Sequence, residues 1–246
     1  MRLVALVASC LLLAACGGNS APATPTPSPV VRPTCPNQDG GDTNHCLGDL
    51  RAGTYTSDNL LTRLTYTVPA GWSNQEDFTN SFVLLPPGAD LSGANEGRSD
   101  SLVVFPAVVA PGHCTGAPAT GVDPSLDGLV GWLKGDKSLR VSNVRDVTVG
   151  GLSGTSLEVA MARPKGDGCR DGVYADLFTT KNPIGLNGGN KVYAVQGVGS
   201  GNRTRLLLLR RGSDVVCIEV AAGTQGDPGF MTAADAVVSS FQFAAS

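Results

Sequence analysis

Four carboxylates in the second half of the chain are the residues best suited to acid–base chemistry or calcium binding: Glu158, Asp167, Asp171 and Asp176. Carboxylates that converge in a folded chain can pass a proton or hold a hard cation. The acidic loop at residues 39–44 offers calcium ligands too, but it lacks the closing Glu of a helix-loop-helix site. Because aspartates are also common turn residues, no catalytic or metal-binding residue is assigned.

Two glycine-rich segments share part of the pattern of an active-site loop. A glycine lies two residues before Ser153, as in a nucleophile elbow, but Thr155 occupies the second glycine position and a strand is expected next. Residues 197–201 have the spacing of a phosphate loop, yet a strand rather than a helix is expected after them. A general base would have to be His45 or His113, and both lie beside cysteines in loops. Both segments therefore predict hairpin turns.

The first fifteen residues have the pattern of a secretory signal. Arg2 precedes a short apolar stretch that ends in small residues, and the stretch is too short to span a bilayer. Residues 13–18, Leu-Ala-Ala-Cys-Gly-Gly, resemble the lipobox of bacterial lipoproteins. This resemblance implies that the Cys16 thiol carries a diacylglyceryl group and that the signal is cleaved just before Cys16. An ordinary secretory signal with an incidental cysteine is the alternative.

The rest of the chain divides into a spacer and one domain. Residues 17–34 contain five prolines among small polar residues, which favours an extended tether over a packed core. We therefore expect a signal peptide at 1–15, a lipidated spacer at 16–34 and one extracytoplasmic globular domain at 35–246. Acyl chains would hold this domain on the outer face of the cell membrane. A net charge of −3 offers no basic surface for nucleic acid.

Five cysteines belong to the predicted domain, and an oxidising compartment favours their pairing. Cys35 and Cys46 share a loop rich in Gly, Asn and Asp, and Cys114 and Cys169 both lie in glycine-rich loops. Cys217 lies inside an apolar run, where it has the character of a small buried hydrophobe. We predict the disulfides Cys35–Cys46 and Cys114–Cys169, with Cys217 free. A Cys/His zinc site is the alternative, although no CxxC pair is present.

The domain has mostly the pattern of β-strands with short connections, which predicts antiparallel neighbours. Alternating or continuous apolar runs predict strands at 65–68, 81–85, 102–109, 147–149, 155–161, 173–178, 191–198, 204–210 and 215–220. The proline at 106 predicts an edge strand or a bulge. The last three strands are expected to form a meander.

Two helices are predicted between these strands. The first follows Asp123, which can cap it, and Pro124, which suits its first position. The second runs from about residue 232 to residue 240. Each has too few apolar residues to stand alone, so each must pack on the sheet. The predicted fold class is α+β, a mostly antiparallel β-sheet with one or two packed helices.

Three features together carry a family resemblance. They are the segment Leu-Thr-Tyr-Thr-Val-Pro-Ala-Gly-Trp at 64–72, the central glycine hairpin, and a C-terminal helix that ends in Ser-Ser-Phe-Gln-Phe at 239–243. Over residues 50–246 the chain resembles actinobacterial lipoproteins with a PsbP/Mog1-like α/β/α sandwich. The resemblance implies a non-enzymatic binding or assembly role and brings no site residues.

The leading hypothesis is therefore a lipid-anchored domain without a cofactor, which binds an envelope lipid, a glycan or a partner protein. The binding surface would be a sheet face or the cleft between sheet and helix. A divergent cell-envelope hydrolase or transferase that uses Asp176 or Glu158 is the alternative.

Overall fold

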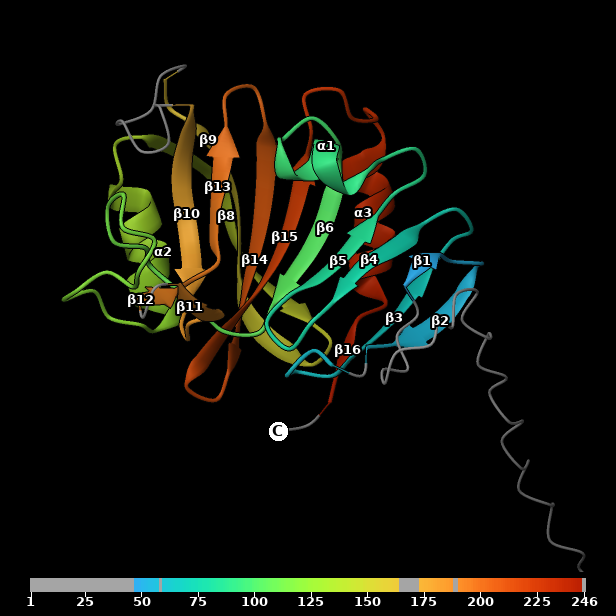
Figure 1. Ribbon diagram of the computed structural model, residues 1–246, viewed down its shortest axis with the longest axis horizontal. Helices are drawn as coiled ribbons and strands as arrows, with labels where there is room; N and C mark the ends of the chain where they lie inside the picture. The colour runs from blue at the N-terminus through green and yellow to red at the C-terminus, as the bar shows by residue number, and fades with distance from the viewer. Residues whose placement is uncertain (1–46, 58, 164–172, 188–189, 245–246) are drawn as a thin grey trace, which may run out of the picture. The chain divides into compact units, whose positions relative to one another are not determined.

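The centre of the fold is an eight-stranded antiparallel sheet in the order β1-β4-β5-β6-β15-β14-β9-β8. The computed structural model describes residues 47–57, 59–163, 173–187 and 190–244, all within one compact unit of the chain, Arg32–Ser246. The middle strands of the sheet lie side by side in Figure 1: β6 (Ser101–Phe105), β15 (Asp214–Ala222) and β14 (Arg203–Arg211). The outer strands are β1 (Gly48–Asp49), β4 (Ser73–Asp77), β5 (Phe82–Leu85), β9 (Leu152–Met161) and β8 (Leu139–Val149).

Smaller sheets accompany the large one. One has the order β13-β10-β7 and contains β13 (Val195–Gly199), β10 (Tyr174–Thr180) and β7 (Val108–Val109). Another has the order β16-β3-β2 and contains β16 (Gln242–Phe243), β3 (Leu64–Val68) and β2 (Gly53–Thr56). A short hairpin pairs β11 (Gly185–Asn187) with β12 (Asn190–Val192).

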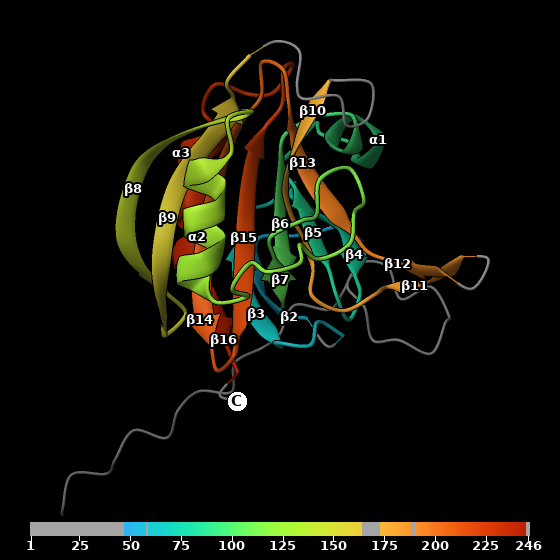
Figure 2. The same ribbon diagram turned by 90° about the vertical axis from the view of Figure 1, so that its left-hand side faces the viewer.

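Each face of the large sheet has its own hydrophobic core, because successive side chains of a strand point to opposite faces. On β14, Leu207 and Leu209 pack with α3 (Phe230–Ser239), whereas Leu206 and Leu208 pack with α2 (Leu126–Gly135). Helix α2 also contacts β8 and β14 (Figure 2). The predicted α+β class, a mostly antiparallel sheet with packed helices, is confirmed.

The short helix α1 (Leu91–Asn95) lies between β5 and β6 in the chain and was not predicted. Its N-cap is Asp90, whose carboxylate accepts a hydrogen bond from the Gly93 N–H at 2.7 Å. Five residues are too few for an apolar stripe, so the periodicity that predicts longer helices is missing here.

The predicted meander of the last three strands is wrong in part. Strands β14 and β15 pair from Arg203↔Ala222 to Arg211↔Asp214, as expected. Residues 191–198, however, divide between β12 and β13, and β13 pairs with β10 rather than with β14. The glycine-rich turn before β14 therefore connects two sheets. The sequence predicts a hairpin there because the same turn residues suit both a hairpin and a crossing from one sheet to another. Asn202 Nδ2 stabilises this crossing by donating to the Gly97 carbonyl oxygen at 2.7 Å.

The single strand predicted at 102–109, at an edge or with a bulge, is wrong in part, because its residues form strands of two different sheets and only β7 lies at an edge. Strand β6 is an interior strand between β5 and β15, and Pro106 follows its last residue. Proline has no N–H for the ladder, so it ends the strand instead of marking an edge. Val108–Val109 then forms β7 in the neighbouring sheet.

The predicted glycine hairpin and both predicted helices are present, with shifted boundaries. Strands β8 and β9 pair as far as Val149↔Leu152, and the turn residues Gly150 and Gly151 have positive φ angles of 56° and 83°. The cap of α2 is Ser125, not Asp123, because the Ser125 hydroxyl accepts from the Gly128 N–H at 3.2 Å. The Asp123 carboxylate instead accepts hydrogen bonds from the Ser125 N–H and hydroxyl. Helix α3 begins at Phe230, two residues before the predicted start.

Candidate functional site

A cavity of about 1050 Å³ lies between the large sheet and the small sheet β13-β10-β7. Residues of β5, β6, β15 and β14 form its floor, and residues of β10 and β13 form the opposite wall. Residues of α1 line it as well. Figure 1 shows α1 at one end of β6 and β13. The cavity lining therefore combines strands of both sheets with the short helix α1.

Glu219 of β15 lies in the floor of this cavity, and its neighbours across the strands are apolar. The antiparallel register places it directly opposite Val103 of β6 on one side and Leu206 of β14 on the other. Residues two apart in a strand share a face, so Cys217 and Ala221 flank it along β15. None of these four neighbours has a charged side chain.

The Glu219 carboxyl is buried and, among the described residues, its Oε2 atom has no hydrogen-bond partner. The residue is only 4% exposed. Burial raises the pKa of Glu219 to about 8, because an apolar environment disfavours the charged carboxylate. At neutral pH the group is therefore mostly protonated. A neutral carboxyl has one O–H donor and acceptor oxygens, and here they are available to a ligand.

Two hydroxyls lie in the next row of the floor. Ala221 is directly opposite Thr204 of β14 and Ser101 of β6, and both hydroxyl residues are buried and line the cavity. They place further hydrogen-bonding groups one row away from Glu219. The polar part of the floor is therefore small and local, as in sites that use a few polar groups to orient a mostly apolar ligand.

Large apolar side chains are exposed at the cavity, beside polar residues such as Asn80 and Asn182. Leu61, Phe78 and Ile184 line the cavity, and these large side chains are 58%, 55% and 49% exposed. Large apolar side chains that gather around a cavity mark an interaction site more often than single exposed ones do.

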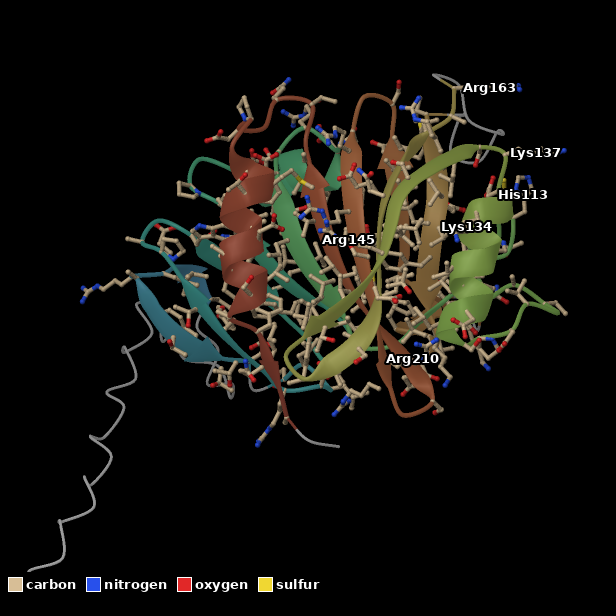
Figure 3. The ribbon with its side chains drawn as sticks, turned by 180° about the vertical axis from the view of Figure 1, so that it is seen from behind. His113, Lys134, Lys137, Arg145, Arg163 and Arg210 are labelled. Atoms are coloured by element: carbon tan, nitrogen blue, oxygen red, sulfur yellow. The ribbon has the colours of Figure 1, made fainter. Side chains whose placement is uncertain are left out.

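Among the described residues that line the cavity, none is a lysine, arginine or histidine. The second carboxylate is Glu76, which accepts a hydrogen bond from the Ser81 hydroxyl at 3.2 Å. Figure 3 shows His113, Lys134 and Lys137 near α2, and these residues do not line the cavity. The described lining thus combines apolar and neutral polar side chains with carboxyl groups and includes no cationic side chain.

The structure does not bring together the two carboxylates of the predicted enzyme alternative. Asp176 lines a smaller cavity of about 350 Å³ together with His113. Glu158 is paired across β9 and β14 with Arg205, which forms an ion pair with Asp235 of α3. The Glu158 carboxylate lies 3.7 Å from the Arg203 guanidinium group. Glu158 thus faces the α3 side of the sheet, whereas Glu219 faces the other side.

Of the predicted cysteine sites, only part falls within the described residues. Cys217 is free and buried, as predicted. Burial, and then the charge of Glu219, raise the pKa of its thiol. Cys114 is a disulfide cysteine, but Cys169, its predicted partner, lies outside the described residues. Cys35 and Cys46 lie outside them as well, so both pairings stay predictions.

Other predicted sites also fall on undescribed parts of the chain, namely Cys16, the loop at 39–44, Asp167 and Asp171. In the described ranges, no cluster of three or more His, Cys, Asp or Glu side chains is arranged to bind a metal. Nor does a helix in those ranges have both the length and the apolar character needed to cross a membrane.

Comparison with known proteins gives distant structural similarity and no sequence family. No protein family model matches the chain, and no curated protein matches it. A protein of Bacteroides thetaiotaomicron VPI-5482 is similar with a TM-score of 0.36 and 10% identity, over 79% of this chain and 49% of that one. The chain therefore spans about half the length of that protein.

A second solved structure is LpqN, described as involved in cell envelope biogenesis of Mycobacterium tuberculosis. It is similar with a TM-score of 0.29 and 12% identity, over 73% of this chain and 82% of that one.

Proposed function

We propose that this domain is a binding protein of the bacterial cell envelope, which holds an amphiphilic small molecule in the cavity between its two sheets. The observation that carries the proposal is Glu219 in the floor of a large cavity, a buried carboxyl whose Oε2 atom has no hydrogen-bond partner among the described residues. Buried polar groups are normally hydrogen-bonded, and an exception that lines a cavity points to a ligand.

The size and lining of the cavity agree with an amphiphile. Small-molecule sites measure about 300–1,000 Å³ and are mostly apolar with a few polar groups. This cavity, of about 1050 Å³, is just above that range. Exposed apolar side chains among its lining residues, including Leu61, Phe78 and Ile184, offer contacts to an apolar tail.

The proposal includes a lipid anchor at Cys16 and a tether over residues 17–34. An extended chain of this length reaches on the order of 50 Å at about 3.1 Å per residue. Such a reach lets the domain exchange a ligand with the bilayer to which it is attached.

Binding of N-phenyl-1-naphthylamine, a fluorescent apolar amine that is uncharged at neutral pH, tests the proposal on the full chain. We expect saturable binding with one site per chain. Ala221→Trp places a large side chain in the floor and should abolish binding. The matched control is Val144→Trp, at an exposed position of β8 outside the cavity, which should bind as the wild type does.

Circular dichroism and thermal unfolding establish that both variants are folded. Absence of binding by the wild type, or equal binding by Ala221→Trp and the wild type, would contradict the proposal.

A further inference from the structure

We infer that the cavity selects amphiphiles with an uncharged head group, and that Glu219 recognises them by donating its carboxyl proton to an ester, amide or hydroxyl oxygen of the ligand. This inference rests on the proposed function and specifies the ligand class of the same cavity.

The surroundings of Glu219 determine its protonation state. Its register neighbours Val103 and Leu206 are apolar, and its Oε2 atom has neither solvent contact nor a hydrogen-bond partner among the described residues. An ionised carboxylate in such a place would lose its hydration without compensation. The neutral form is favoured instead, and it has a proton to donate.

Other titratable groups also face the cavity or lie beside Glu219. Glu76 and Tyr174 line it, and the thiol of Cys217 is next to Glu219 on the same face of β15. Lysine, arginine and histidine are missing from the described lining. An anionic head group, such as a free carboxylate or a phosphate, would thus be buried beside carboxyl groups without a cation. Burial of an unpaired charge is strongly unfavourable, so anionic amphiphiles are excluded.

Cationic head groups match the cavity less well than uncharged ones. A cation would bind Glu219 only if the carboxyl ionised, and both charges would then lose their water. A buried ion pair compensates for that loss only when further hydrogen bonds satisfy both partners. Ser101 and Thr204 are the polar residues in the adjacent row of the floor. The Tyr174 hydroxyl already donates to the Glu96 carbonyl oxygen at 3.3 Å. An uncharged acceptor is therefore the better match.

A series of ligands with one tail and three head groups tests the inference. We would displace N-phenyl-1-naphthylamine from the full chain at pH 6.5 with monodecanoylglycerol, decanoate and decyltrimethylammonium, each below its micelle concentration. We expect monodecanoylglycerol to bind at least tenfold more tightly than either charged ligand.

Two substitutions identify the donor. Glu219→Leu keeps an apolar floor but removes the donor, so monodecanoylglycerol should bind about tenfold more weakly, the typical worth of one hydrogen bond. The affinity for the dye is measured separately for each variant, and circular dichroism and thermal unfolding establish that the variant is folded. Glu219→Gln keeps an N–H donor and should retain most of the affinity for monodecanoylglycerol.

The outcomes separate this inference from the proposed function. If the dye binds but decanoate or decyltrimethylammonium equals or exceeds monodecanoylglycerol, the selection of uncharged head groups is wrong and the binding function stands. If Glu219→Leu binds monodecanoylglycerol like the wild type, Glu219 is not the donor and the inference fails. If neither the dye nor any of the three amphiphiles binds, both proposals fail.

Discussion

Glu219 of β15 and Val103 of β6 are directly opposite each other in the antiparallel ladder of the large sheet. A cross-strand pair shares one face, so the residue beside Glu219 on this face of β6 is aliphatic and offers the carboxyl no polar partner. The other neighbour, Leu206 of β14, is apolar too. The interior strands β6, β15 and β14 thus shield the Glu219 carboxyl from solvent, and the same strands form part of the floor of the cavity.

The first prediction is that stability decreases with pH because of Glu219. The pKa of the carboxyl is about 8 in the folded chain, against an ordinary value of 4.5 that applies when the chain is unfolded. Between these values the unfolded state releases a proton that the folded state keeps, so the free energy of unfolding falls as pH rises. The fall is on the order of a few kcal/mol across this window. It ends near pH 8, above which both states are ionised.

Urea unfolding at pH 5, 6.5 and 8 measures this effect. Glu219→Gln cannot ionise, so its free energy of unfolding should depend less on pH, and the variant should be more stable than the wild type at pH 8. The same pH dependence in both proteins would show that other groups cause it.

The second prediction concerns Asp100, which connects the start of β6 to the loop before α3. Its Oδ1 atom accepts from the Gly223 N–H at 2.9 Å, and its Oδ2 atom accepts from the Asp227 N–H at 2.7 Å. The residue is buried. Asp100→Ala leaves two N–H groups without their acceptor, so we expect a loss of about 2–4 kcal/mol.

Thermal or urea unfolding measures this loss, and Asp127→Ala is the matched control. Asp127 is a highly exposed carboxylate that pairs with Arg210, and such surface pairs contribute about 0–1 kcal/mol. Equal stability of Asp100→Ala and Asp127→Ala would contradict the assigned role of Asp100.

The class of the fold could be predicted from the sequence because strand and helix patterns are local. The runs at 204–210 and 215–220 predicted β14 and β15, and the glycine turn at 150–154 predicted the β8–β9 hairpin. Which strands pair is a non-local property. The glycine turn before β14 reads as a hairpin turn, yet the contact between Asn202 and Gly97, 105 residues apart, belongs to a crossing between sheets.

Glu219 was missed for a related reason. It interrupts the apolar run of β15, a run whose pattern predicts a buried Cys217 and assigns no role to Glu219. A charged residue in such a run is a signal for a special site, since glutamate is rarely buried without a partner. The sequence does not reveal that the two sheets separate there, because the cavity is formed by β10 and β13 on one side and by β6, β15 and β14 on the other.

The third prediction is the cysteine pattern. Peptide mapping of the unreduced chain should find Cys35–Cys46 and Cys114–Cys169, with Cys217 as a free thiol. Because Cys217 is buried and its pKa is raised, it should react with an alkylating reagent only after the chain is unfolded. Detection of Cys217 in a disulfide, or its rapid alkylation in the folded protein, would contradict this pattern.

The fourth prediction is that Cys16 is the membrane anchor. Cys16→Ser removes the thiol that accepts the lipid, so the variant should leave the membrane fraction while the wild type stays in it. Cys10→Ser is the matched control, because Cys10 lies within the signal that we expect to be cleaved. Fractionation followed by mass analysis of the N-terminus reports both acylation and cleavage. Retention of Cys16→Ser in membranes would show that another feature anchors the chain.

The fifth prediction links the state of Glu219 to ligand release. Binding of an uncharged amphiphile through the carboxyl proton should weaken as pH rises past about 8, where the group ionises. An ionised Glu219 has no proton to donate and attracts water into the floor. Affinity for monodecanoylglycerol at pH 6.5, 8 and 9.5 measures this. Glu219→Gln retains its N–H donor at every pH, so its affinity should stay level, whereas a parallel decline in both proteins would assign the effect to another group.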